Sequence, residues 1–440
     1  MNQNFKKYVI FWLSQSISQL GSSMTSFALI LWVYSIRHSA MTVSLMAFCR
    51  YVPDILTSLF AGAFVDTHNK KRIMLVSDTV AAFATLSVFA LYLGGGLTIP
   101  YIYLINCVIG VAGAFQAPAS SVAVGILVPR EKLANASGMV SFSGNLISIF
   151  APVIATALYG FGGLDLILAI DFLSFAFAFL VLLCAISIPE EKRPDKAAQS
   201  APASEETAGK KDSLFTGCKA GYAFLRRHSG LFLIMITMAM LNFFSRLTYE
   251  NILSPMILSR SGQNYYALSI VNAAMGIGGV LGGIFVSAGR MPKNAAKTIY
   301  FSAGLSFLLG DLLMGLGRSP LLWAFAGFMA SAPIPFINAG QNVILYRTVP
   351  QEMQGRVFSV RNAVQFCTIP VGILLGGFLA DYVFEPFMQS EGSIARILRF
   401  LVGSGDGSGM AVMFLCTGLL GSLCSFFFYR QKKVRALGEL

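Results

Sequence analysis

Long apolar runs recur through this 440-residue chain, with polar loops between them. Each run is about as long as, or longer than, the roughly 20 residues that a helix needs to cross a bilayer. A β-barrel does not fit, because barrel strands alternate polar and apolar residues and these runs are continuous. With 55% hydrophobic and only 12% charged residues, the composition is also far from that of a soluble domain. The sequence therefore predicts an all-α membrane protein of twelve transmembrane helices, at about 8–34, 41–65, 73–95, 99–127, 136–161, 164–188, 230–258, 265–288, 296–317, 320–348, 356–380 and 409–429.

Basic residues are unevenly distributed between the loops, and this predicts an orientation. Lys and Arg gather at both termini and in every second loop, whereas the alternate loops hold only Arg37, Arg260, Arg318, Arg396 and Arg399. By the positive-inside rule, the richer loops face the cytoplasm. We therefore expect a multi-pass protein of the bacterial inner membrane with both termini cytoplasmic. The net charge of +12 belongs to these loops and does not predict nucleic-acid binding.

The second half of the chain repeats features of the first at a constant offset. Gly62-Ala-Phe-Val and Gly283-Ile-Phe-Val lie 221 residues apart, and so do the two Val-Pro-x-Glu segments that begin at Val128 and Val349. Such an offset indicates duplication of a six-helix unit. We expect an N-terminal bundle over 1–188, a cytoplasmic linker over 189–229 and a C-terminal bundle over 230–440.

Within the linker, residues 189–212 are rich in charge, Pro, Ala and Ser and cannot bury themselves. The part from Ser213 to His228 mixes apolar and basic residues. It is either a short amphipathic helix on the cytoplasmic leaflet or a solvated connector, and the sequence leaves both open.

The loop after the second run reads Gly62-x-x-x-Asp66-Thr67-His68-Asn69-Lys70-Lys71-Arg72. It resembles the loop G-x-x-x-D-[RK]-x-G-[RK]-[RK] of the major facilitator superfamily, with Thr67 and Asn69 as departures. The resemblance implies two pseudo-symmetric six-helix bundles and a conformational gate at this loop. In that gate Asp66 would cap the helix that begins near Gly355 and Arg356, and Asp78 would be the partner of Lys71 or Arg72.

Two further segments sharpen the resemblance. The run Val349-Pro350-x-Glu352 followed by Gly355-Arg356-Val357-Phe358, together with Ala169-Ile170-Asp171, resembles the drug:proton antiporter branch that includes macrolide efflux proteins. The branch implies proton-coupled export of small lipophilic or amphipathic compounds. It also contains siderophore and lysophospholipid transporters, so export or flipping of such a substrate is an alternative.

Charged residues within the predicted spans are costly, roughly 2.5 to 3.5 kcal/mol each on insertion scales, and mark candidate functional groups. Arg50 and Asp54 share one run, Arg246 and Glu250 another, and both pairs have i,i+4 spacing. Each pair either only makes insertion tolerable or provides a carboxyl, Asp54 or Glu250, that exchanges a proton as its arginine moves. Asp171 is the third candidate for proton coupling.

The other polar residues of the spans have simpler expected roles. Asp311, near the end of its run, is expected to reach out to the membrane surface. Glycine pairs at 278/282, 279/283 and 372/376 are expected to let helices approach closely. In the superfamily the first, fourth, seventh and tenth helices line the central cavity, which makes the following residues candidates for substrate binding: Gln15, Gln19, Asn106, Gln116, Asn242, Asn338, Gln341 and Asn342.

Several functional classes find no support in the sequence. There is no GxxxxGK[ST] phosphate loop for an ATP motor, and no HExxH or GxSxG lies on a predicted span. The three histidines lie in loops or at helix ends, and the seven cysteines lack CxxC spacing. We therefore predict a transporter that is not an enzyme, without metal or cofactor, with protons and a small molecule as partners, and monomeric. A non-transporting membrane sensor is the alternative of another class.

Overall fold

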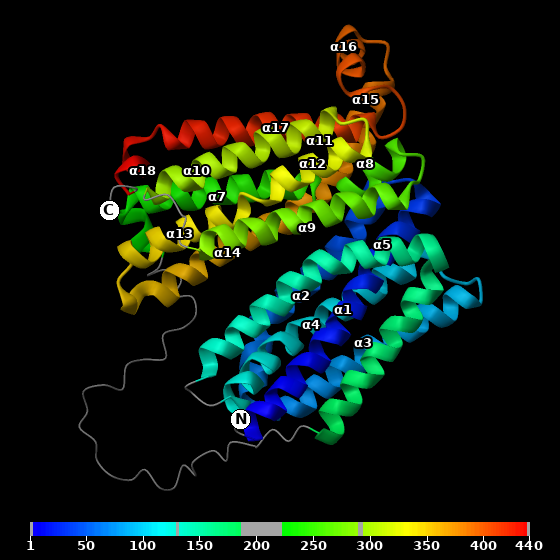
Figure 1. Cartoon of the computed structure of the whole chain (residues 1–440), viewed down its shortest axis with the longest axis vertical. Coiled ribbons are helices and arrows are strands. Elements are labelled where there is room, and N and C mark those ends of the chain that lie inside the picture. The colour runs from blue at the N-terminus through cyan, green and yellow to red at the C-terminus, as the bar shows by residue number, and fades with distance from the viewer. Residues whose placement is uncertain (1–2, 129–131, 186–221, 289–293, 438–440) are drawn as a thin grey trace.

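The computed structural model describes residues 3–128, 132–185, 222–288 and 294–437. Helices account for nearly all of these residues, and the described part contains no strand. Figure 1 shows the helices as two groups, one built by the first half of the chain and one by the second.

The N-terminal group contains five continuous helices and a short π-helical end. They are α1 (Gln3–Arg37), α2 (Ala40–Thr67), α3 (Lys70–Leu93), α4 (Ile99–Leu127), α5 (Leu133–Leu180) and η2 (Val181–Ala185). The side chains of Ser39 and Asn69 accept hydrogen bonds from the first turns of α2 and α3. Such caps satisfy amides that a helix start leaves unpaired, so short polar loops are enough to separate the spans.

One glycine turns α5 into two spans. Gly163 has a φ of 72° within the 48-residue helix, a conformation that glycine adopts without strain. The turn falls between the predicted fifth and sixth runs. These two runs are therefore joined with almost no loop.

In the C-terminal group most spans are assembled from shorter helical pieces. In chain order the spans are α7 (Ser229–Thr248) with α8 (Leu253–Arg260); α9 (Tyr265–Ser287); α10 (Ala295–Leu305), η3 (Ser306–Asp311) and α11 (Leu312–Leu316); α12 (Pro320–Ser331) with α13 (Ile334–Thr348); α14 (Gln351–Phe378), η4 (Leu379–Phe384) and α15 (Glu385–Gln389); and α17 (Ser408–Tyr429). Two short helices lie outside the spans: α16 (Ser393–Val402) and α18 (Lys432–Ala436). Where two pieces of one span meet, the helix bends or changes its hydrogen-bond pattern, and the chain continues in the same general direction.

The number of spans agrees with the twelve predicted. Ten stretches of the described chain are long and apolar enough to cross a membrane. One of them, Phe142–Cys184, contains the turn at Gly163 and so supplies two crossings. The 28-residue helix α2 is a further element of span length. The predicted all-α membrane fold is therefore confirmed.

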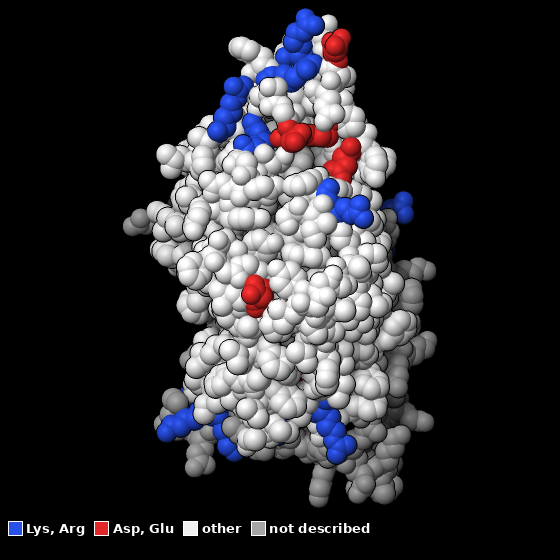
Figure 2. All heavy atoms as spheres, turned by 90° about the vertical axis from the view of Figure 1, so that its right-hand side faces the viewer, with Lys and Arg blue, Asp and Glu red and all other residues white. Residues whose placement is uncertain are grey.

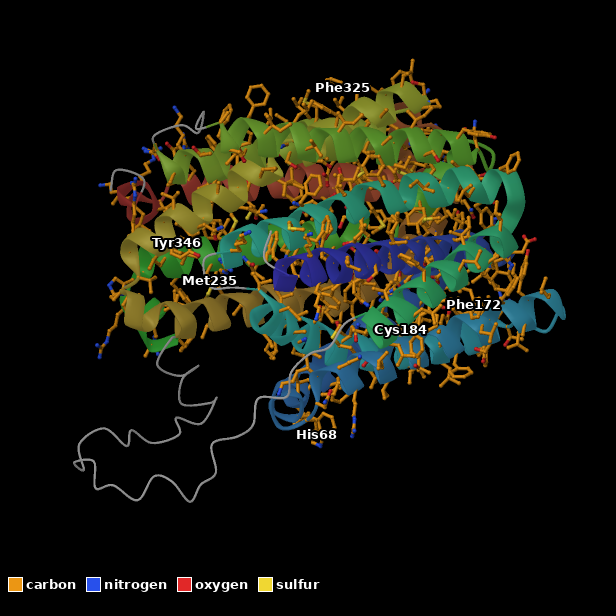
Figure 3. All side chains as sticks on the ribbon, turned by 60° about the horizontal axis from the view of Figure 1, so that its bottom comes forward. His68, Phe172, Cys184, Met235, Phe325 and Tyr346 are labelled. Atoms are coloured by element: carbon orange, nitrogen blue, oxygen red, sulfur yellow. The ribbon has the colours of Figure 1, made fainter. Side chains whose placement is uncertain are left out.

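The outer surface of the spans is apolar, as contact with lipid requires. Phe172 and Phe325 lie at the periphery of the two groups of helices and are 37% and 47% exposed (Figure 3). Many large aliphatic and aromatic side chains on the other spans are exposed in the same way. Lipid is the natural partner for such side chains, so their exposure carries no cost in a bilayer.

Most of the linker prediction falls outside the described residues. Residues 222–227 are helical, and Leu225 is buried against the C-terminal group, whereas residues 186–221 are not described. The choice between an amphipathic helix and a solvated connector therefore remains open for the greater part of the segment.

The two groups of helices meet at one end only, among the described residues. We call this the closed end and define it by the loops around Ser39 and Gln263; the opposite end, where α1 begins and α17 ends, is the open end (Figure 1). Between α5 and α9, Ser269 donates to the Val153 carbonyl at 3.3 Å. The rings of Tyr159 and Tyr265, nearer the loops, lie 5.2 Å apart.

Close helix contacts occur at some of the predicted glycine pairs and not at others. A Cβ atom at Gly278 or Gly282 would collide with the main chain of Phe328 or Ala332, so α9 and α12 approach there to backbone contact. Gly372 and Gly376 pack in the same way against α7. Gly279 and Gly283 have open space around them, so the prediction was wrong for that pair.

We predict that Gly282→Ala destabilises the protein and that Gly283→Ala, its neighbour, does not. Overpacking of a tight contact typically costs about 1 to 3 kcal/mol. The measurement is the thermal midpoint of the purified protein in detergent, followed by size-exclusion chromatography after heating. Equal midpoints for the two variants would contradict the assigned packing faces.

Candidate functional site

A carboxylate of the C-terminal half caps a helix of the N-terminal half at the closed end. Asp381 in η4 accepts hydrogen bonds from Ser39 Oγ at 2.5 Å, from the Ala40 amide at 3.1 Å and from the Met41 amide at 2.9 Å. A helix N-terminus carries a partial positive charge, which favours a carboxylate at this position. We call this contact the Asp381 latch. The sequence analysis did not predict it, although an acid directly follows the eleventh run and a capping serine precedes the second.

Deeper in the membrane, a second set of polar contacts joins the halves. Glu250 pairs with Arg246, as the i,i+4 spacing predicted. Tyr51 of α2 also donates to Glu250, at 2.8 Å, and so connects the ion pair to the other half. Asn251 donates to Ser44 of α2 and, at 2.9 Å, to the Ile373 carbonyl. Polar contacts between specific helices therefore join the halves at the closed end, beside an apolar core that contains buried residues of both halves.

The second predicted ion pair does not form. Arg50 and Asp54 are both described, yet no ion pair joins them. Arg50 instead donates to Ser26 of α1 at 2.6 Å. Gly110 of α4 packs against the main chain of α2 at these same residues. The i,i+4 spacing would allow the ion pair, but the Arg50 guanidinium binds a hydroxyl group on a neighbouring helix instead.

In the N-terminal half, two acids face one small pocket between α1, α3 and the second span of α5. Asp171 is 3% exposed and accepts hydrogen bonds from Ser22 at 3.1 Å and Thr85 at 3.5 Å. Asp78 lines the same pocket and accepts from Gln116 of α4 at 2.9 Å. The expected partners of Asp78 were Lys71 and Arg72, so the structure gives this acid a different hydrogen-bond partner.

In the C-terminal half, a cavity of about 290 Å³ opens between α7, η3, α12, α13 and α14. Three predicted binding residues, Asn242, Asn338 and Gln341, line it together with several serines and apolar side chains. None of the described residues that line it is Lys, Arg or His. The cavity thus offers amide and hydroxyl groups in an otherwise apolar wall, as small-molecule sites commonly do.

Asp311 also lines this cavity, which corrects the expectation that it reaches the membrane surface. It is 1% exposed and accepts a hydrogen bond from Thr417 of α17 at 2.7 Å. It ends η3, a π-helical segment, and such segments often occur at functional sites. Its position near the end of an apolar run suggested snorkelling, but the run continues into α11 and keeps the carboxyl inside the bundle.

The other predicted binding residues are dispersed. Asn106 is buried and donates to the Ile102 carbonyl of its own helix at 2.9 Å. Gln15 lies near Asp78, whereas Gln19 is exposed. The side-chain amide of Gln116 donates its hydrogen bond to Asp78.

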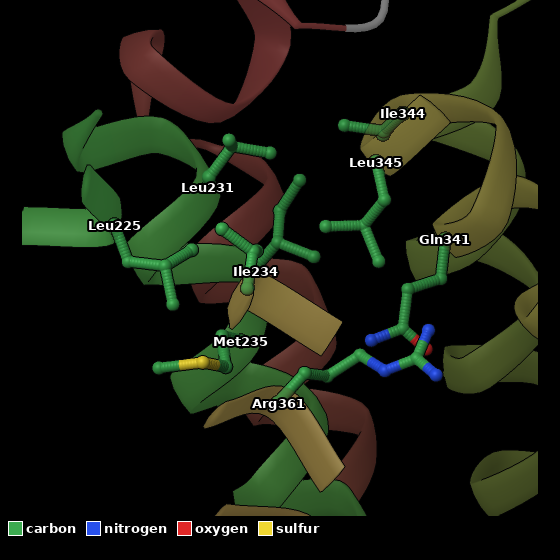
Figure 4. A pocket seen from close by; sticks show the side chains of 9 residues that line it. Leu225, Leu231, Ile234, Met235, Gln341, Ile344, Leu345 and Arg361 are labelled. Carbon is green, nitrogen blue, oxygen red and sulfur yellow. The ribbon is translucent and has the colours of Figure 1, made fainter. Parts of the chain in front are cut away.

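Asn342 is exposed, and its partner Arg361 lines a second, smaller pocket of the C-terminal half. Arg361 of α14 donates to Asn342 at 3.3 Å. Figure 4 shows Arg361 and Gln341 pointing toward each other across this pocket, whose other walls are apolar. Gln341 thus lines both this pocket and the larger cavity.

The predicted gate loop is described only in part. Asn69 caps α3 through the Arg72 amide at 3.0 Å, so this substitute for the family glycine serves as a helix cap. Lys71 donates to the Leu183 carbonyl at 3.1 Å. A Cβ atom at Gly62 would meet no described atom within 4 Å, and Lys70 begins α3. Gly355 lies in the second turn of α14, but the side chains of Asp66 and Arg356 lie outside what the structure describes, so the predicted cap stays a prediction.

Metal ligation finds no site among the described residues, since no three His, Cys, Asp or Glu side chains come together there.

We predict that Arg246→Met destabilises the closed end by leaving Glu250 without its cation. The two side chains are 31% and 28% exposed, so the loss should stay below the roughly 3 to 5 kcal/mol of a fully buried pair. The double variant Arg246→Met/Glu250→Gln should recover most of the thermal midpoint, measured in detergent. A double variant that melts no higher than the single one would contradict this account of the pair.

Comparison with known proteins agrees with this geometry. The sequence model described as Major Facilitator Superfamily matches residues 11–372. Macrolide efflux protein A of Streptococcus pyogenes is 25% identical over 395 residues, which cover 87% of this chain and 91% of that protein. The multidrug efflux pump Tap of Mycolicibacterium fortuitum is 25% identical over 377 residues, covering 82% and 86%.

Among solved structures, an inward-facing, unoccupied bacterial homologue of the human lysosomal transporter Spinster superposes with a TM-score of 0.69 at 12% identity, covering 100% of this chain and 98% of that one. An inward-facing bacterial homologue of the iron transporter ferroportin gives 0.66 at 13% identity, covering 97% and 99%. These likenesses support the fold. Twelve spans, two bundles that meet at one end and a family match over most of the sequence lead to one conclusion: the chain belongs to the major facilitator superfamily and is a membrane transporter.

Proposed function

We propose that the protein is a proton-coupled exporter of small lipophilic or amphipathic compounds that works by alternating access. Proton coupling is inferred from two buried carboxyl groups, Asp171 in the N-terminal half and Asp311 in the C-terminal half. Each lies at the wall of a cavity and accepts hydrogen bonds from hydroxyl side chains. No ion pair in the described part of the chain involves either acid. A carboxyl group in apolar surroundings without a nearby cation favours the protonated form. When water enters the cavity, loss of the proton from that carboxyl becomes more favourable.

The substrate path in this proposal passes the larger cavity of the C-terminal half. Asn242 of α7 and Asn338 and Gln341 of α13 offer hydrogen bonds, and apolar residues such as Met238 and Phe307 supply much of the remaining wall. An adaptable apolar wall with few polar groups suits compounds of varied shape. The efflux function named for two relatives is consistent with such a site.

Orientation follows from the basic loops. The open end carries Lys70, Lys71 and Arg72 at the start of α3 and the basic residues of α18, which the positive-inside rule assigns to the cytoplasm. The closed end would then face the outside, and the described conformation would be open to the cytoplasm. This supports loading of substrate from the cell interior.

The two gates would act at opposite ends of α2. The Asp381 latch holds the start of α2 to the C-terminal half and stabilises the inward-open state. By resemblance to the family, Asp66 near the end of α2 would hold the outward-open state. Glu250, bonded to Tyr51 across the halves, would lose that partner when the closed end opens. Asp54 also remains a candidate for proton exchange.

We predict that Asp171→Asn and Asp311→Asn each uncouple transport from the proton gradient. In wild-type proteoliposomes a protonophore should abolish uphill efflux of a fluorescent amphipathic compound. The variants should retain downhill movement and lose uphill efflux, because a neutral amide keeps hydrogen bonds and cannot carry a proton. Glu391→Gln, at an exposed acid of the closed end, is the control. Wild-type efflux that ignores the protonophore would refute coupling.

We further predict that Asp381→Asn shifts the conformational equilibrium toward the outward-open state. The substitution removes the charge that the N-terminus of α2 stabilises, an effect typically worth about 0.3 to 2 kcal/mol, or up to roughly thirtyfold in the equilibrium. Distances between spin labels on the first turns of α2 and α9 report it, with Glu391→Gln as control. An unchanged distance distribution would show that the latch does not bias the two states.

A further inference from the structure

The short helix α16 (Ser393–Val402) occupies the connection between α15 and α17 at the closed end. Figure 1 shows it at the top of the view, above α15 and α17, where it projects across the direction of the spans and beyond their outline. At ten residues it is far too short to cross a bilayer. The predicted spans leave this segment, between the eleventh and twelfth runs, without an assigned structure.

One side of α16 is apolar and has no protein partner. Ile394, Ile397 and Leu401 follow each other at helical spacing and are 66%, 62% and 45% exposed. Phe400, which is 84% exposed, lies at the border of this side, because it follows Arg396 by about one helical turn. In water, four large apolar side chains on a ten-residue helix would form an unfavourable patch.

The basic side chains of α16 lie on its opposite side. Arg396 is two positions after Ile394, and Arg399 is two positions before Leu401. Residues two positions apart on a helix point about 200° away from each other. Figure 2 shows charged side chains gathered at this tip of the closed end, above a broad surface with almost no charge. An apolar side opposite an arginine side is the pattern of helices that lie flat in a membrane interface.

Several hydrogen bonds fix α16 in this position. Arg318 donates to the carbonyls of Phe400 at 2.7 Å and Leu401 at 3.2 Å, and Arg260 donates to that of Val402. They satisfy carbonyls that a helix end leaves unpaired. Ala395 and Val402 are fully buried beneath the helix. The exposed apolar side therefore belongs to an anchored helix and has a defined direction.

Lipid-facing residues adjoin α16 on two sides. Tyr382, Val383 and Phe387, in the last turns before the connection, are 64%, 42% and 38% exposed. Leu321, three residues after Arg318, is 78% exposed at the start of α12. The apolar side of α16 thus continues the surface that the spans present to acyl chains.

We propose that α16 is an interfacial helix that binds phospholipid at the closed end of the transporter. Ile394, Ile397 and Leu401 enter the upper acyl region, and Arg396 reaches lipid phosphates from the water side, as snorkelling arginines do. The partner is the bilayer surface itself, and the inference does not depend on which compound is exported.

Spin labels on matched positions test the proposal in the full-length protein. The seven native cysteines are replaced by serine or alanine, and a nitroxide is attached after Ile394→Cys, Leu401→Cys or, as control on the opposite side, Arg396→Cys. The proteins are reconstituted in vesicles of phosphatidylcholine and phosphatidylglycerol. Labels at 394 and 401 should collide several-fold more with oxygen than with a water-soluble nickel chelate, and the label at 396 should show the reverse.

Two results would overturn the proposal. Strong collision with the nickel chelate at all three positions would place α16 in water. Weak collision with both reagents at 394 and 401, with dipolar broadening between labels, would identify a second copy of the chain as the partner. Leu401→Trp and Arg396→Trp in the native cysteine background give an independent reading: brominated lipids should quench the added tryptophan at 401 and spare the one at 396.

Discussion

The absence of water from the bilayer core governs both the backbone and the polar side chains of this protein. Main-chain amides and carbonyls must pair within the chain there, so the spans are helical and even their irregular pieces, η3 and η4, remain hydrogen-bonded turns. The same constraint acts on polar side chains. Asp171 finds two hydroxyls, Asp311 finds Thr417, and Arg50 reaches Ser26 on another helix. Polar contacts between helices are consequently few, specific and informative.

These contacts are distributed in a way that suits alternating access. Within the described residues, the hydrogen bonds between the halves lie toward the closed end, at Asp381, Asn251, Glu250 and Ser269. The bundles elsewhere contain their own polar networks and their own cavities. In the proposed mechanism each half would move as a body, and the contacts to be broken would be these hydrogen bonds and the apolar contacts between the halves.

The sequence predicted the fold well and the partners of polar residues poorly, for a physical reason. Apolar runs, Gly163 and capping residues such as Asn69 act locally, so the spans and their ends could be inferred from neighbours along the chain. The Arg246–Glu250 pair is also local. Arg50, Asp78 and Asp311 instead bind residues 24, 38 and 106 positions away, and no spacing rule reveals such partners. The Asp381 latch, 340 positions or more from its donors, belongs to the same class.

The Asp381 latch also has a genetic consequence. Two of its three donors are main-chain amides, which every residue except proline supplies whatever its side chain. Substitutions at positions 40 and 41 therefore leave those donors in place, and only one side of the contact is readily altered by mutation. An ion pair can be restored by exchanging its charges, but no reciprocal change on α2 can rescue a lost carboxylate. Suppressors of defects at this position should arise at sites that rebalance the two conformations.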